Sequence, residues 1–233
     1  MKLLPTVLTL VTGYETFESG NAKIPSDLKS CIFTDSERGD GGDRIVGGTD
    51  AGENSWPWIV QLGRTLANGT DFDFCGGTVI HDRYVLTAEH CLEGIHSSDP
   101  EDTVAPMSEF YLTFGEWKRS DGIKYKSKIL KAHFRPDRFE YNGDVNNFSA
   151  DLAILEFPSL EENAPAEFDD KIGIACLPKQ QFVKGANCWI GGWGFTSLKS
   201  TAMTDVLLET NISLMSSEYC RDKSFLEVID NKR

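Results

Sequence analysis

Residues 85–91 read Val-Leu-Thr-Ala-Glu-His-Cys. The first three are β-formers, so the stretch begins as a strand. It ends in a titratable imidazole, His90, directly before a cysteine, Cys91. A disulfide at that cysteine would pin the backbone beside the histidine. The stretch therefore predicts a strand that carries a fixed histidine to its end.

Short apolar runs of the same kind occur on both sides of this stretch, separated by turn residues. They lie at 58–62, 78–80, 84–87, 110–114, 129–133, 152–157, 188–190 and 206–215. We find no repeat period and no long amphipathic helix. Many short strands between turns indicate an antiparallel sandwich or barrel, so we expect an all-β fold.

Length and charge limit the kinds of function. With 233 residues the chain can form one large domain or two smaller ones. Its net charge of −13 makes a phosphate-binding surface a poor prediction, so we expect no nucleic-acid partner.

The cysteines and the N-terminus point to the secretory route. Six cysteines contain no C-x-x-C pair, which argues against a zinc ribbon or a thioredoxin-type site, and their wide spacing suits disulfides in an oxidising compartment. Three N-glycosylation sequons begin at Asn68, Asn147 and Asn211. Residues 1–20 have an apolar stretch after Lys2, too short to span a bilayer, and read as a signal peptide; a buried strand is the alternative. We expect a secreted, extracellular protein without a membrane span.

Residues 21–44 differ from the rest of the chain in composition. They are polar and end in a Gly- and Asp-rich stretch at Arg44. Such a stretch buries little surface and is open to a protease, although a plain linker would look the same.

Seven motifs follow one another in a fixed order. They are Arg-Ile-Val-Gly-Gly at 44–48, Trp-Pro-Trp at 56–58, Cys-Gly-Gly-Thr-Val-Ile at 75–80, the stretch 85–91, Asp-Leu-Ala-Ile-Leu at 151–155, Ala-Cys-Leu-Pro at 175–178, and Cys-Trp-Ile-Gly-Gly-Trp-Gly at 188–194. By this ordered set the chain resembles the chymotrypsin- and trypsin-like serine proteases, peptidase family S1. The resemblance implies two six-stranded antiparallel Greek-key β-barrels. Residues 45–171 would form a complete first barrel, and residues 172–233 would form the linker and an incomplete second barrel.

The resemblance also assigns roles to two side chains. His90 would be the general base, and Asp151 would hold the imidazole and stabilise its cation. For the other histidines, His81, His96 and His133, we expect ordinary packing or surface positions. The family's nucleophile lies in a Gly-Asp-Ser-Gly-Gly segment, which does not occur in these 233 residues. The oxyanion hole and the specificity pocket would be lost with it, so we expect truncation and no catalysis by this chain alone.

By the same resemblance, residues 21–44 would be the pro-segment of a zymogen. Cys75 would pair with Cys91, and Cys31 in the pro-segment would pair with Cys176. The family's partners for Cys188 and Cys220 would lie beyond Arg233, which leaves these two cysteines unpaired. A direct bond between them is the alternative.

These expectations combine into one function and one alternative. The chain would be a serine endopeptidase zymogen, activated when another protease cuts after Arg44 and frees Ile45, and acting on proteins or peptides without a cofactor. A calcium or other metal site is not expected, because residues 115–119, Gly-Glu-Trp-Lys-Arg, offer too few oxygen ligands. The alternative is a secreted, non-catalytic binding or regulatory homologue. It is allowed by the absent serine and by Glu89, which could hold the proton that the base must exchange.

Overall fold

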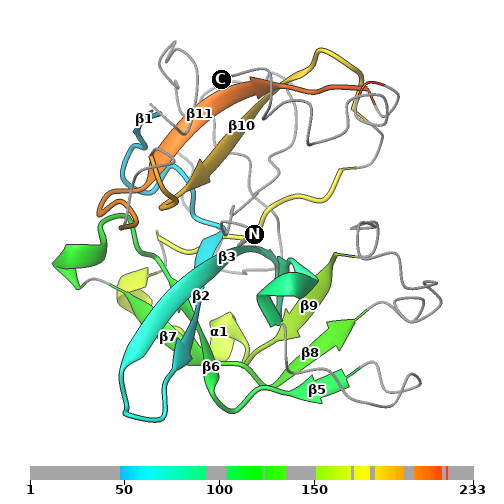
Figure 1. Cartoon of the computed structure of the whole chain (residues 1–233). Helices are drawn as coiled ribbons and strands as arrows, with labels where there is room; N and C mark the ends of the chain where they lie inside the picture. Colours follow the sequence, from blue (N-terminus) through cyan, green and yellow to red (C-terminus); the bar gives the residue numbers. More distant parts are fainter. Residues whose placement is uncertain are drawn as a thin grey trace.

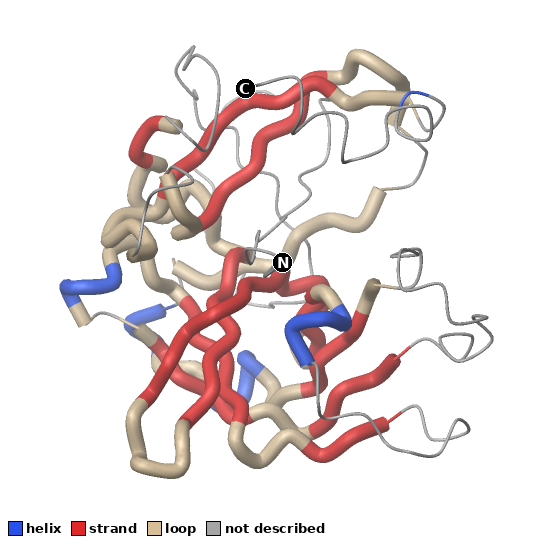
Figure 2. The backbone as a smooth tube through the Cα atoms, in the orientation of Figure 1, coloured by secondary structure: helices blue, strands red, loops and turns tan. Residues whose placement is uncertain are grey.

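The computed structural model describes residues 48–92, 104–122, 124–134, 151–168, 171–178, 182–196, 202–216 and 219. Figures 1 and 2 show these parts as a mostly β structure with short helical turns. In chain order the elements are β1 Thr49–Asp50, β2 Ile59–Thr65, β3 Asp71–His81, β4 Tyr84–Thr87, η1 Glu89–Leu92, β5 Val104–Pro106, β6 Phe110–Phe114, η2 Arg119–Asp121, β7 Tyr125–Lys128, β8 Lys131–Phe134, β9 Ala153–Glu156, α1 Leu160–Asn163, η5 Ala166–Phe168, β10 Asn187–Gly192 and β11 Leu208–Ser213.

The larger sheet has the strand order β5-β8-β9-β4-β3-β2-β6-β7, and every pairing in it is antiparallel. Strands β7 and β8 lie far apart in this order, yet only Ile129 and Leu130 separate them in the chain. They form one bent strand, whose first half pairs with β6 and whose second half pairs with β9. At the bend, the Leu130 N–H donates to the Glu156 carbonyl at 2.8 Å. The bent strand therefore closes the sheet into a barrel of six strands, with β5 as a short addition beside β8.

Alternating side chains fill this first barrel. On β9, Ala153 and Leu155 point into the core, whereas Ile154 between them is exposed. Phe114 on β6 and Phe157 after β9 are fully buried, with ring centroids 5.1 Å apart. Burying a side chain of this size stabilises the fold by roughly 1.5–3 kcal/mol. The all-β fold and the first barrel are as predicted.

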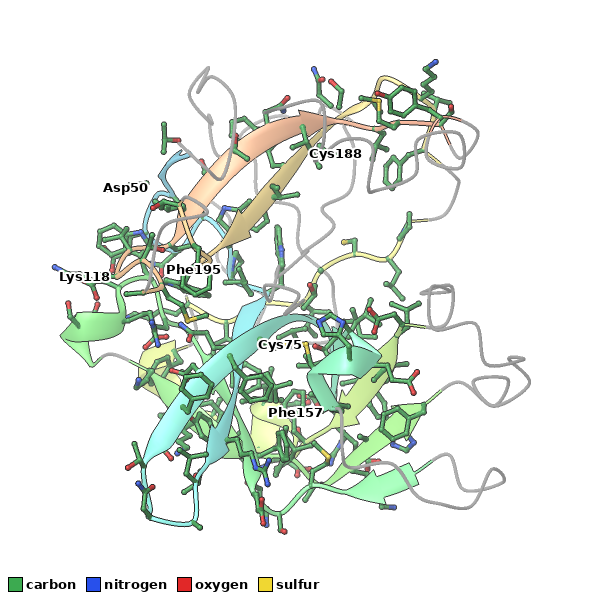
Figure 3. All side chains as sticks on the ribbon, viewed as in Figure 1. Asp50, Cys75, Lys118, Phe157, Cys188 and Phe195 are labelled. Carbon is green, nitrogen blue, oxygen red and sulfur yellow. A yellow bond between two sulfur atoms is a disulfide. The ribbon has the colours of Figure 1, made fainter. Side chains whose placement is uncertain are left out.

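The second region is a smaller sheet in the order β1-β11-β10, also antiparallel. In it β11 lies in the middle, with β1 opposite Leu208 and Glu209 and with β10 along its whole length. Figure 3 places Cys188 on this sheet and Cys75 on the first barrel. Only part of a second barrel is present among the described residues, as predicted.

One tryptophan joins the two regions. The indole of Trp56 lies against Gly191 of β10, where an added Cβ would come within 2.9 Å of the ring. Its Nε1–H donates to the carboxylate of Glu209 on β11 at 2.6 Å. Trp193 and Leu207 belong to the same apolar core as the first barrel. The two regions therefore share one apolar core.

We also searched the described residues for a helix of the length and apolarity needed to cross a bilayer, and none has them.

Candidate active site

The register of two strands brings His90 and Asp151 together. Strands β4 and β9 are antiparallel partners, and Thr87 at the end of β4 faces Ala153 at the start of β9. His90 comes three residues after Thr87, in η1, and Asp151 comes two residues before Ala153. Both residues therefore lie just outside the paired strands, at the same end of the barrel. The pairing brings them into contact although they are 61 positions apart in the sequence.

The Asp151 carboxylate contacts both the backbone and the ring of His90. Its Oδ1 accepts the backbone N–H of His90 at 2.8 Å, and its Oδ2 lies 2.8 Å from the imidazole Nδ1. The backbone bond fixes the carboxylate, so the second oxygen is aimed at the ring. A proton on Nδ1 is then held by the carboxylate, and Nε2 keeps the lone pair of a base. The side chains of His90 and Asp151 are 41% and 22% exposed, so solvent reaches the histidine ring.

A disulfide holds this histidine segment to the barrel wall. Cys91 in η1 is bonded to Cys75 on β3, and Thr87 Oγ1 donates to the Gly76 carbonyl at 2.8 Å. The sulfur of Cys91 lies 3.8 Å from Nε2 of His90. The cluster of Cys75, Cys91 and His90 resembles a metal-binding triad in spacing. Because its two sulfurs are bonded to each other, they are not thiolate ligands, and we assign no metal to it.

Glu89 is the first residue of η1 and is half-buried. It is Asp151 that contacts Nδ1 of the neighbouring ring.

The other histidines have different partners. His81 packs on Tyr84, with ring centroids 5.4 Å apart, and its Nδ1 accepts the backbone N–H of Arg83. His133 Nε2 lies 2.9 Å from a carboxylate oxygen of Glu156.

Several predicted site residues lie outside the described ranges. They are Cys31, Arg44, Ile45, His96, Asn147 and Cys220. Cys176 is disulfide-bonded, and its partner is not among the described residues, so the bond to Cys31 stays a prediction. Cys188 is a free, buried cysteine, and burial raises the pKa of its thiol. Asn68 lies in the β2–β3 turn and Asn211 lies in β11.

Sequence reasoning missed two buried carboxylates. Glu116 is only 5% exposed; it accepts a hydrogen bond from Gln61 Nε2 and forms an ion pair with Lys124 at 3.2 Å. Burial raises the pKa of Glu116 above its usual 4.5, against the lowering effect of Lys124. The other is Glu209, bonded to Trp56. A glutamate in a loop normally faces solvent, so Glu116 gave no signal, whereas Glu209 stands out as the one charge in the run 206–215.

The closed first barrel and the partial second one have the arrangement of a trypsin-like double β-barrel. The family model described as Trypsin matches residues 45–232, and the chain belongs to this family. It is 27% identical over 179 residues to Transmembrane protease serine 5 from Homo sapiens. That match covers 76% of this chain and 35% of the relative, so the chain spans about a third of the relative's length.

Proposed function

We propose that this chain belongs to a secreted serine endopeptidase made as a zymogen. In it, His90 is the general base, and Asp151 orients the imidazole ring and stabilises its cation. The double contact of Asp151 with the backbone and ring of His90 carries this proposal. With Nδ1–H held by the carboxylate, Nε2 takes the proton from an attacking hydroxyl and later gives it to the leaving amine. Asp151 stabilises the imidazolium that forms between these steps.

For the protease candidate, we expect the nucleophile outside these 233 residues. These 233 residues contain no Gly-Asp-Ser-Gly-Gly sequence, so they offer neither a serine with flanking glycines nor the amide donors beside it. We therefore expect the isolated 233-residue chain not to hydrolyse peptides. Its substrates, when the nucleophile is supplied, are proteins or peptides.

Activation by cleavage after Arg44 fits the position of β1. This strand begins at Thr49, four residues after Ile45, and pairs with β11 in the second region. A cut after Arg44 would free an amino group four residues before this strand in the sequence. Secretion is supported by the disulfide between Cys75 and Cys91.

The second candidate is a secreted, non-catalytic homologue that binds other proteins. The absence of the serine segment from these residues and the presence of Glu89 both allow it. The two candidates agree on the fold and differ only in whether an acyl-enzyme can form.

Two experiments separate them. Sequencing the transcript beyond the Arg233 codon will show a Gly-Asp-Ser-Gly-Gly segment if the protein is a protease, and a stop codon or a replaced serine if it is a binding homologue. On protein, a fluorophosphonate probe should label the natural product after cleavage at Arg44 and should not label its His90→Ala variant. Labelling of the isolated 233-residue chain would overturn the proposal that it lacks a nucleophile.

A further inference from the structure

The turn between β2 and β3 presents an asparagine in a conformation suited to modification. Residues 66–70, Leu-Ala-Asn-Gly-Thr, are all exposed, and Gly69 has φ +81°, in the left-handed region. The backbone N–H of Thr70 donates to Asn68 Oδ1 at 3.0 Å, which closes an Asx-turn. The amide nitrogen Nδ2 takes no part in this bond, and Thr70 supplies the hydroxyl of the third position of the sequon.

Beside this turn lies an apolar surface that nothing in the described part of the chain covers. Phe72 on β3 is 57% exposed and Leu66 is 43% exposed. Phe72 faces Arg64 across the hairpin, and Leu66 follows Arg64 by two positions, so both side chains lie on one face. The Phe72 ring stacks on Phe74, with centroids 6.1 Å apart and an interplanar angle of 8°. One face of an aromatic pair is therefore left in water at the hairpin tip.

We propose that Asn68 carries an N-linked oligosaccharide and that its first sugars cover the exposed faces of Phe72 and Leu66. The co-reactant is a lipid-pyrophosphate-linked oligosaccharide with its membrane transferase. Nδ2 attacks the anomeric carbon of the sugar, the new N–C bond forms as the C–O bond to pyrophosphate breaks, and a base of the transferase takes the amide proton. Sugar rings have apolar C–H faces that pack against aromatic rings, and their hydroxyls keep the surface wetted.

The sequon at Asn211 provides an internal comparison. Asn211 lies within β11, half-buried and opposite Trp189, and the hydroxyl of Ser213 at its third position donates to Asn187 Oδ1 at 3.3 Å. Among the described residues, Asn211 lies in a strand and not in an Asx-turn, and it has no exposed pair of stacked rings beside it such as Phe72 and Phe74. Asn211→Gln is therefore a matched control for the loss of a sequon as such.

The test of modification is direct and does not depend on the signal peptide of the chain. The full chain is secreted from cultured animal cells behind a signal peptide from another protein, and its peptides are analysed after N-glycosidase treatment. We expect Asn68 to be converted to aspartate by the glycosidase, and the glycosidase-sensitive mobility shift to decrease in Thr70→Ala but not in Thr70→Ser. An unmodified Asn68 in the secreted wild-type chain overturns the proposal.

The test of covering uses the same proteins. Thr70→Ala keeps Asn68 but loses the glycan, so it should bind more of an apolar fluorescent dye than the wild type or Asn211→Gln. Adding Phe72→Ser to Thr70→Ala should return dye binding to the wild-type level. Peptide mapping of the Cys75–Cys91 disulfide in each variant shows that the barrel has folded. Equal dye binding with and without the glycan, in proteins with that disulfide intact, shows that the glycan does not cover this surface.

Discussion

The first barrel and the three-stranded sheet are built from similar strands but reach different degrees of completion. In the first barrel the bent strand β7–β8 pairs on both sides, and side chains such as Phe114 and Leu155 are fully buried. In the smaller sheet, β10 has β11 as its only partner among the described strands, and Cys188 on it is free. Large apolar side chains at the end of this sheet, Val183 and Met215, are 74% and 55% exposed. Closure, more than composition, distinguishes the two regions.

The contact between His90 and Asp151 lies on the first barrel. His90 and Asp151 both follow from the register of β4 with β9, inside the closed barrel. Of the second region, the described residues form only the three strands β1, β11 and β10. The contact between His90 and Asp151 can therefore be examined on the first barrel alone, without any catalytic activity.

The largest expected effect is in the core of the closed barrel. Phe114→Ala should lower the free energy of unfolding by about 3–5 kcal/mol, because it leaves a cavity against Phe157. Urea unfolding followed by tryptophan fluorescence measures it. Phe72→Ala on the same barrel should change stability by less than about 0.5 kcal/mol, because Phe72 is exposed. Similar losses for both variants would contradict the idea that closure concentrates stability inside the barrel.

Next in size is the disulfide that holds the histidine segment. The Cys75–Cys91 bond closes a separation of 16 residues, so replacing both cysteines by serine should cost about 3 kcal/mol. The measurement is again a urea midpoint, under non-reducing conditions. Cys188→Ala removes a cysteine from the other region and should cost only about 1 kcal/mol. If the order of the two effects is reversed, the first barrel is not the more firmly closed of the two regions.

A substitution at Trp56, which joins the two regions, should affect the smaller sheet before the first barrel. Trp56→Phe removes the N–H that Glu209 accepts, a hydrogen bond to a charged group worth roughly 1.5–3 kcal/mol. Hydrogen exchange should quicken in β11 before it changes in β4 and β9. Trp58→Phe is the matched control, because Trp58 is buried and its Nε1 has no hydrogen-bond partner in the described part of the chain. Equal exchange in the two variants would show that Trp56 acts by packing alone.

A smaller effect should appear as a dependence of stability on pH. Burial raises the pKa of Glu116, so the folded state binds its proton more tightly than the unfolded state does. The contribution of Glu116 is therefore most favourable near pH 4.5 and below, and it is lost as the pH rises through the higher pKa of the folded state. Relative to Glu116→Gln, the wild type should lose stability over that range. Glu109→Gln, which removes an exposed ion pair with Arg64, should change stability by less than about 1 kcal/mol. A flat difference curve for Glu116→Gln would mean that its carboxylate is balanced by Lys124.

Local pattern predicted much of the fold, and tertiary closure determined the rest. The runs 84–87 and 110–114 have the bounds of β4 and β6, because apolar side chains and flanking turns mark both ends. The run 129–133 missed β7 and crossed the bend, since that bend exists only because the strand must meet both β6 and β9. Strand β3 starts at Asp71, seven residues before the predicted run 78–80, because its first half is an exposed hairpin arm. The resemblance predicted roles for His90 and Asp151, whereas the contact between them follows from the register of β4 with β9.

The smallest expected change in stability tests the site itself. Asp151→Asn should cost less than about 1 kcal/mol, because the pair is partly exposed and an asparagine oxygen can still accept the His90 N–H. Its amide group would then face Nδ1 as a donor, so the neutral ring must carry its proton on Nε2, where it can no longer act as a base. Nitrogen-15 NMR of the imidazole distinguishes the two tautomers. Glu109→Gln, at an exposed carboxylate that pairs with Arg64 and not with His90, is the control that should leave the proton on Nδ1. A ring that stays protonated on Nδ1 in Asp151→Asn would show that this carboxylate does not orient it, and that the closed barrel alone does not prepare the base.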